Sequence, residues 1–165
     1  MKGYYFSDSH GFHRDLKMPK DIDLIIFGGD MSNVKNPTLN EHECRMFLDW
    51  YNKLPIAYRI LIAGNHDTSI EAKLIDVYEE YKNIYYLEHG TIDIEDASTG
   101  ENIKIFGSPY TPEFNNWAFN VRRDRLHDYW KAIPEDTDIL GTHGPPKGIL
   151  DLSKDREDKL EFCGD

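Results

Sequence analysis

The sequence predicts a layered α/β fold that contains a mixed β-sheet, and three features of its pattern lead to this prediction. Short apolar runs typical of buried strands alternate with segments of helical periodicity in the first half of the chain. Two β-like runs in the middle are separated by a turn signal, as in an antiparallel hairpin. A helical pattern and a final strand follow the hairpin. Such an alternation stacks helices against a sheet that has both parallel and antiparallel strands.

The first half of the chain is expected to form four strands and two helices. Asp23–Phe27 contains a continuous apolar run that ends in Gly28-Gly29, as expected for a strand buried on both faces. Asn40–Leu54 has apolar residues at helical spacing, and Pro55 follows it. The other expected elements are strands at Tyr4–Ser7, Arg59–Ala63 and Ile84–Leu87 and a helix at Ile70–Tyr81.

The second half is expected to add a hairpin, a helix and a strand. Ser98-Thr99-Gly100 supplies the hairpin turn, and Pro134 stops the helix. The expected elements are strands at Thr91–Ile94, Ile103–Phe106 and Thr137–Leu140 and a helix at Asp124–Ala132. Because no repeat, low-complexity tract or linker divides the sequence, residues 1–165 are expected to form a single domain.

The composition narrows the possible functions. A net charge of -11 disfavours a protein that grips long nucleic acid, because such proteins need Lys and Arg to displace counterions. A small phosphorylated substrate stays compatible with this charge, since two bound divalent ions reverse the local field. A nuclease is therefore a disfavoured alternative. The apolar runs are too short for a membrane span.

The cellular setting expected from the sequence is the cytoplasm. Asp8 and His10 come too early for a secretory signal to precede them. Cys44 and Cys163 are far apart, so a disulfide framework is not expected.

Four of the predicted strands end in loops rich in residue types that bind metals. These loops are Asp8-Ser9-His10, Gly29-Asp30, Gly64-Asn65-His66-Asp67 and Thr142-His143-Gly144. The carboxyl ends of strands in an open α/β sheet converge on one crevice, so we expect the four loops to meet there. Carboxylate and imidazole ligands without thiolate favour Mn, Fe or Zn in a two-metal centre over a structural zinc site.

The spacing within these loops indicates how the ligands divide between two ions. Asp8 and His10 alternate at a strand end, so both can face one ion. Asp30 is placed to bridge, and Asn65 and His143 can offer an amide oxygen and an imidazole nitrogen to the second ion. Taken singly, each motif has a plain alternative: a strand-end turn, an ordinary turn residue or a buried histidine.

His66 is expected to act as a general acid rather than a ligand. It follows Asn65 directly and cannot easily point at the same ion. We expect His66 to protonate the leaving alcohol, with Asp67 orienting its ring and raising its pKa. His13 follows the first loop and is a candidate contact for a substrate phosphate, with a core or surface histidine as the alternative.

The four loops, in this order, resemble the signature blocks of the calcineurin-like metallophosphoesterases. The first three match the family at large, and Thr142–Pro146 resembles the fourth block of the metallophosphoesterase-domain-containing, UPF0046-type branch, the brain protein 239 group. Ile105–Pro112 and Phe114–Asn120 are similar to the middle segment of that branch. The resemblance covers essentially Gly3 to Asp151.

This resemblance implies a four-layer α/β/β/α sandwich and hydrolysis of a phosphate ester through in-line attack by a metal-bridging hydroxide. It implies a first ion held by Asp8, His10 and Asp30, a second held by Asp30, Asn65 and His143, and His66 as the acid. The substrate is expected to be small, with a nucleotide as one candidate. The resemblance also puts the middle segment near the cleft, which makes Asn116 and Trp117 candidate substrate contacts, with a core position as the alternative for Trp117.

The sequence departs from the family at its end. The fifth block, a Gly-His-x-His on a later strand, has no counterpart before Phe162-Cys163-Gly164-Asp165. We expect a chain truncated relative to the family, with a short natural form or a degenerate relative as alternatives. The consequences expected are weaker metal retention, and an unpaired edge at Thr137–Leu140 that favours a homodimer. A non-catalytic nucleotide-binding or regulatory module is the alternative function.

Overall fold

A parallel sheet forms the first part of the structure, a computed structural model that describes residues 1–154 and 160–162. Its strands lie in chain order: β1 (Gly3–Phe6), β2 (Leu24–Phe27), β3 (Tyr58–Leu61) and β4 (Tyr85–Tyr86). Every residue of β2 is buried, which accounts for its unbroken apolar run. The predicted strand at Asp23–Phe27 is therefore confirmed.

The second sheet is mixed, as the hairpin signal predicts. It consists of β5 (Gly90–Asp96), β6 (Glu101–Ser108) and β9 (Ile139–Thr142). β5 pairs with β6 antiparallel, and β6 pairs with β9 parallel. β9 begins two residues later than predicted because its pairing with β6 starts at Ile105 opposite Ile139. Among the described residues, β9 pairs with β6 alone and forms an edge of its sheet.

The helix α1 (Pro37–Tyr51) begins earlier than predicted because Asn36 caps it, accepting hydrogen bonds from the backbone N–H groups of Thr38 and Leu39. The single helix predicted over Ile70–Tyr81 is wrong. The structure has two short helices there, α2 (Thr68–Glu71) and α3 (Val77–Glu80). Lys73 has a positive φ of 55°, which ends the first helix, and the Asp76 side chain caps the second.

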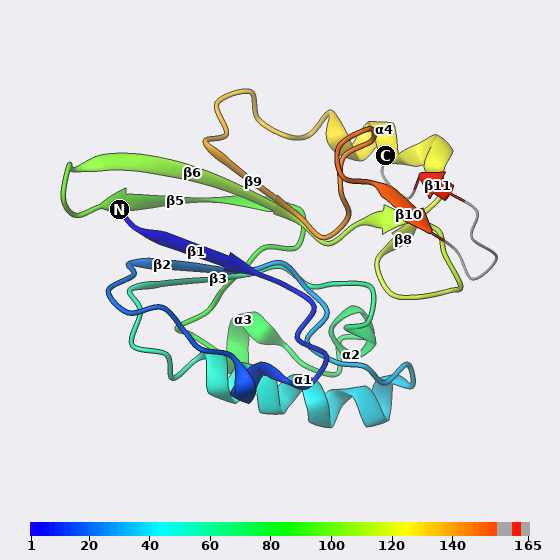
Figure 1. The fold of residues 1–165 in the computed structure, drawn as a ribbon, viewed down its shortest axis with the longest axis horizontal. Coiled ribbons are helices and arrows are strands. Elements are labelled where there is room, and N and C mark those ends of the chain that lie inside the picture. Colours follow the sequence, from blue (N-terminus) through cyan, green and yellow to red (C-terminus); the bar gives the residue numbers. More distant parts are fainter. Residues whose placement is uncertain (155–159, 163–165) are drawn as a thin grey trace.

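The two sheets pack face to face, with helices on their outer sides (Figure 1). α1, α2 and α3 lie on the outer side of the first sheet, and α4 (Arg123–Trp130) lies beyond the second. One apolar cluster, which includes Phe27, Phe47 and Tyr51, fills the space between α1 and the first sheet. Another, which includes Ile26, Ile60 and Ile105, lies between the sheets. Each such side chain contributes roughly 1.5–3 kcal/mol by its burial.

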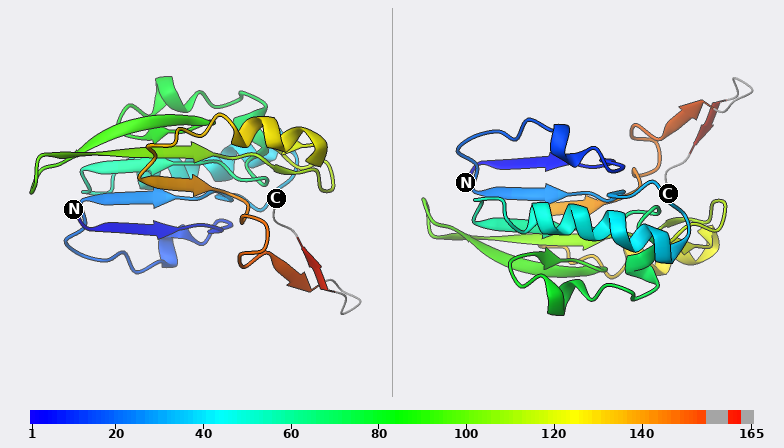
Figure 2. Two further views of the ribbon diagram at one scale, coloured as in Figure 1. Left: turned by 90° about the horizontal axis from the view of Figure 1, so that it is seen from above. Right: turned by 90° about the horizontal axis from the view of Figure 1, so that it is seen from below.

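Short elements complete the described chain. They are η1 (His13–Asp15), β7 (Thr111–Pro112), β8 (Asn120–Val121), β10 (Leu152–Lys154) and β11 (Leu160–Phe162). β10 and β11 form an antiparallel pair that extends away from the sheets (Figure 2). Cys44 is a buried free thiol, and Cys163 lies outside the described residues. Within the described part of the chain, no helix has the length and apolar character to cross a bilayer.

Candidate metal centre

The loops that follow β1, β2, β3 and β9 meet at one end of the two sheets. His10 Nε2 lies 3.9 Å from Asp8 Oδ1 and 3.8 Å from Asp30 Oδ2. His143 Nε2 lies 2.8 Å from Asn65 Oδ1 and 3.3 Å from Asp30 Oδ1. The structure therefore brings together all five residues predicted as ligands, although they come from four distant segments. Their role as metal ligands stays a prediction.

The Asp30 carboxylate divides this cluster into two halves, one at each of its oxygens. We call Asn65, His143 and Asp30 Oδ1 the inner half-site, and Asp8, His10 and Asp30 Oδ2 the outer half-site. The side chains of Asp30 and His143 are only 5% and 7% exposed. Those of Asp8 and His10 are 57% and 30% exposed. A carboxylate in this position can bind one cation with each oxygen.

The imidazole rings of His10 and His143 are oriented in the same way. His10 Nδ1 lies 2.9 Å from the carbonyl oxygen of Ser32, and His143 Nδ1 lies 2.8 Å from that of Gly28. A carbonyl only accepts hydrogen bonds, so Nδ1 carries the hydrogen in both rings. In the neutral ring, the Nε2 lone pair then faces oxygen atoms of Asp30 and its neighbours. These electron-rich atoms repel one another unless a cation or proton lies between them, and metal-bound histidines typically show this orientation. The donor set therefore fits divalent ions.

The backbone around the cluster is closely packed and conformationally unusual. A Cβ on Gly64 would overlap Asp30 Oδ1 and lie 2.7 Å from His143 Cε1, so a glycine is needed at this position. Asp8, His10 and Asp30 all have positive φ angles, of 55°, 40° and 64°. Such conformations are costly for residues other than glycine and are concentrated at functional sites.

Asp67 has a different role from the one predicted for it. Its buried carboxylate accepts hydrogen bonds from the backbone N–H groups of Asp30, Met31 and Gly64, at 3.0, 2.9 and 2.7 Å. His66 Nδ1 has no hydrogen-bond partner among the described residues. The expectation that Asp67 orients the His66 ring is therefore wrong, because both of its oxygens tie the Asp30 loop to its own loop. Burial raises the pKa of Asp67 to about 7, with a contribution from the charge of Asp30, against the lowering effect of the N–H donors.

His66 faces the outer half-site. Its Nε2 lies 4.0 Å from Asp30 Oδ2, and one ligand atom each of His10, Asp30 and His66 lie within 4.8 Å of one another. Burial lowers the pKa of His66, while the carboxylate of Asp30 opposes this shift. This position allows His66 to act as an acid or as a third ligand of that half-site.

The three predicted substrate contacts lie in very different places. Trp117 is at the site, stacked on the His66 ring with 4.0 Å between ring centroids and 24° between planes. Asn116 is exposed beside it. His13 is wrong as a substrate contact, because η1 turns its ring into the core, where it is 1% exposed and packs on Phe47 and Trp50.

The model of the family described as calcineurin-like phosphoesterase matches residues 4–164. The chain belongs to this family. The layered fold and the order of its loops agree with that membership, and the resemblance predicted from the four loops is confirmed.

Several relatives of this calcineurin-like phosphoesterase are known by sequence. The chain is 35% identical to metallophosphoesterase domain-containing protein 1 of Homo sapiens over 163 residues, which cover 88% of this chain and 48% of the relative. It is 39% identical to the probable rhamnogalacturonate lyase C of Emericella nidulans over 152 residues, covering 88% of this chain and 14% of that protein. A UPF0046 protein of Caenorhabditis elegans is 28% identical over 165 residues, 92% of this chain and 53% of the relative. The chain thus spans about half the length of the human and nematode relatives and a much smaller part of the fungal one.

Sequence reasoning missed the groups that orient the predicted ligands of this phosphoesterase. The carbonyls of Gly28 and Ser32 carry no side-chain signal, since every residue has one. Asn40 was also missed: its amide donates to the His66 carbonyl at 2.7 Å, and its Oδ1 accepts from the Ser69 N–H at 3.0 Å. A polar residue among the buried positions of α1 was the available signal for it.

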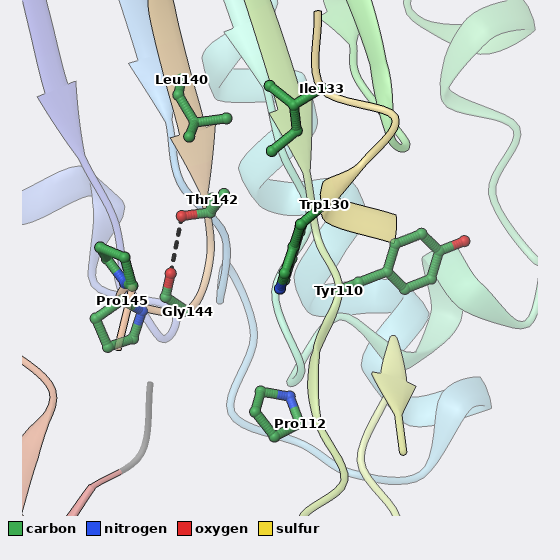
Figure 3. A pocket seen from close by; sticks show the side chains of 9 residues that line it. Tyr110, Pro112, Trp130, Ile133, Leu140, Thr142, Gly144 and Pro145 are labelled. Atoms are coloured by element: carbon green, nitrogen blue, oxygen red, sulfur yellow. Dashed lines mark hydrogen bonds between the residues drawn. The ribbon is translucent and has the colours of Figure 1, made fainter. Parts of the chain in front are cut away.

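An apolar pocket of about 270 Å³ lies between β9 and the end of α4 (Figure 3). Its walls include Trp130 and Ile133 near the end of α4 and Leu140 on β9. Thr142 and Gly144 also line it, whereas the imidazole of His143 between them reaches the other way, to Gly28 and Asn65. The pocket and the candidate metal centre therefore lie on opposite sides of the segment Thr142–Gly144.

Proposed function

We propose that this calcineurin-like phosphoesterase hydrolyses a small phosphodiester or phosphomonoester, such as a nucleotide, with the help of two divalent ions. The observation that carries the proposal is the Asp30 carboxylate, which has one oxygen toward His143 and the other toward His10. Both imidazoles are oriented by a backbone carbonyl so that Nε2 faces the carboxylate. A bridging ligand between two oriented imidazoles suits a pair of Mn, Fe or Zn ions.

In this proposal the two half-sites hold one ion each. The ions supply, when bound, a nucleophile at neutral pH and positive charge for the phosphoryl oxygens. Asp8 and His10 would hold the outer ion, Asn65 and His143 would hold the inner one, and Asp30 would offer a carboxylate oxygen to each. Asp67 keeps the Asp30 loop in place through its hydrogen bonds to the backbone.

His66 is proposed to donate the proton to the leaving oxygen. Its Nε2 faces the outer half-site, which is open to solvent and can therefore receive a substrate. As the bond between phosphorus and the leaving oxygen breaks, the proton on Nε2 passes to that oxygen, and His66 becomes neutral. The acidic protein surface favours a small substrate over a nucleic-acid polymer.

The first test is the substitution Asp30→Asn. Loss of the bridging charge affects both ions at once. Since changes to groups that only support a ligand lower metal affinity about 10- to 100-fold, we expect a loss of at least about 100-fold in Mn²⁺ affinity. Hydrolysis of bis(4-nitrophenyl) phosphate should fall at least as much. Asp93→Asn, an exposed carboxylate on β5, is the matched control and should change neither quantity. Full activity in Asp30→Asn would refute the proposed centre.

A non-catalytic nucleotide-binding module is a second candidate, favoured by the high exposure of Asp8 in the outer half-site. An ion held there loosely would bind a nucleotide phosphate without completing hydrolysis. Calorimetric titration with a nucleoside monophosphate in the presence of Mn²⁺ separates the two candidates. Tight binding without turnover of any phosphate ester favours the module.

A further inference from the structure

The His66 ring lacks the hydrogen bond that orients the other two imidazoles of the site. Its Nδ1 is buried without a hydrogen-bond partner among the described residues, and its Nε2 lies 4.0 Å from the nearest Asp30 oxygen. The backbone of His66 is nevertheless firmly held. Its N–H donates to Asp30 Oδ1 at 2.8 Å, and its carbonyl accepts from Asn40 at 2.7 Å. Hydrogen bonds therefore fix the backbone of His66 but not the orientation of its ring.

Aromatic packing holds the ring instead. The indole of Trp117 stacks on the imidazole with 4.0 Å between centroids and 24° between planes. The ring of His10 meets the same imidazole edge-on, at 4.9 Å and 78°. Rotation of the His66 ring about its Cβ–Cγ bond would lose the parallel stacking. Such ring pairs contribute about 0.5–1.5 kcal/mol beyond the area that they bury.

Trp117 is itself anchored to the loop that carries His66. The N–H of Ala118 donates to the carbonyl of Asn65 at 3.0 Å, directly before His66. The N–H of Phe119 donates to Glu71 Oε1 at 2.7 Å, and both Ala118 and Phe119 are buried. These hydrogen bonds hold the segment of Trp117 beside the loop that carries His66, so that the two rings can stack.

Lys35 makes two further contacts with the segment that carries Trp117. Its ammonium lies 4.7 Å from the centroid of the Trp117 ring and donates to the carbonyl of Asn115 at 2.5 Å. A cation over an indole is attracted by the negative face of the ring. The ring face of Trp117 that His66 covers is also closed to a substrate base. These contacts indicate that Trp117 acts on the orientation of the His66 ring and not on a substrate base.

We infer that Trp117 is a positioning residue that aims the His66 imidazole at the leaving oxygen of the substrate. The inference rests on the proposed function, in which His66 donates the proton. It assigns to aromatic stacking the task that a carboxylate at Nδ1 performs in many general acids. Trp117 acts through His66 and does not take part in the reaction itself.

A comparison of leaving groups tests this inference. 4-Nitrophenolate leaves easily without a proton, whereas phenolate benefits more from an acid. With the full chain and added Mn²⁺, Trp117→Leu should lower kcat/KM for diphenyl phosphate about 3- to 10-fold, as expected from the stacking energy. The loss for bis(4-nitrophenyl) phosphate should be clearly smaller. Trp117→Phe, which keeps an aromatic face, should restore most of the rate for diphenyl phosphate.

Two further variants make the outcome unambiguous. Phe114→Leu removes an exposed aromatic ring from the same segment and should leave both rates unchanged. His66→Ala should show the same selective loss as Trp117→Leu, but larger. If His66→Ala lowers both rates equally, the acid role in the proposed function is wrong. If His66→Ala is selective and Trp117→Leu is not, only the positioning role is wrong.

A spectroscopic measurement tests the geometry without activity. In the metal-free protein, the carbon-bound ring protons of His66 lie over the indole of Trp117 and should be shielded by its ring current. Trp117→Leu should shift these resonances downfield, while those of His127 on α4 stay in place. Unchanged His66 resonances in Trp117→Leu would overturn the inference whatever the kinetics show.

Discussion

The inner and outer half-sites contain similar side chains but differ sharply in their contact with water. The inner half-site lies between the sheets, where Asn65 follows β3 and His143 follows β9. The outer half-site lies at the end of β1, an edge strand of its sheet. This difference in position leaves Asp8 about half exposed and His143 almost fully buried.

Because of this difference, two similar sets of polar side chains make unequal contributions to the stability of the fold. A polar atom without a partner costs more when it is buried than when water can reach it. A cation in the inner half-site would therefore stabilise the fold as well as bind substrate. Water can replace lost contacts in the outer half-site, and we expect its ion to exchange more readily. The substrate should enter from this outer side.

Among the changes that separate the two half-sites, Gly64→Ala should have the strongest effect. The added methyl group would overlap Asp30 Oδ1, crowd the ring of His143 and lie 2.4 Å from the backbone nitrogen of Asp30. We expect the affinity for the first Mn²⁺ ion to fall by at least about 100-fold. Overpacking should also lower the free energy of unfolding by about 1–3 kcal/mol. Calorimetric metal titration and urea unfolding measure the two effects.

Gly90→Ala is the matched control for this substitution. A Cβ at Gly90 would meet no atom within 4 Å, so metal affinity should stay as in the wild type. If Gly64→Ala also binds Mn²⁺ as the wild type does, the close packing of Asp30 and His143 around Gly64 is not what forms the inner half-site.

A smaller effect is expected when one histidine of each half-site is removed from the metal-free protein. His143→Ala leaves the Gly28 carbonyl without its hydrogen-bond donor in a buried place, which should cost about 1–3 kcal/mol. The His10 side chain is 30% exposed, so water can take its place at the Ser32 carbonyl, and His10→Ala should cost about 1 kcal/mol or less. Urea unfolding with a chelator present measures both. Equal losses in the two variants would contradict the contrast between the half-sites.

Much of the fold could be predicted because its elements have strong patterns. The buried run of β2, the apolar stripe of α1 and the hairpin turn each indicate one structure. The segment from Ile70 to Tyr81 misleads because two short helices place their apolar residues almost as one long helix does. Nothing in the sequence shows that Lys73 adopts a left-handed conformation, which only tertiary contacts can impose.

The side chains that gather at the site could be predicted from the sequence, but the contacts that hold them in place could not. Asp30 and His143 are recognisable by chemistry and by their place after strands. Adjacency in the chain suggested that Asp67 serves His66, whereas its carboxylate serves the backbone of another loop. The Trp117 stack joins segments about 50 residues apart, and no local pattern encodes such a contact.

A weaker effect, on the pH dependence of stability, is expected from His13, whose ring anchors in the core the loop that begins with Asp8. Burial lowers the pKa of His13 below its usual 6.5, with a contribution from Arg14 and against the opposing charge of Asp15. Below this value the unfolded chain binds the proton more readily than the folded one. The stability that the neutral ring contributes is therefore complete above pH 6.5 and is lost as the pH falls below that value.

The melting temperature of the metal-free protein should decrease as the pH is lowered from about 7 to about 5, and it should decrease less in His13→Phe. His127→Phe, at an exposed position on α4, should keep the wild-type pH profile. If His13→Phe keeps that profile too, then the core position of His13 does not couple the outer loop to pH.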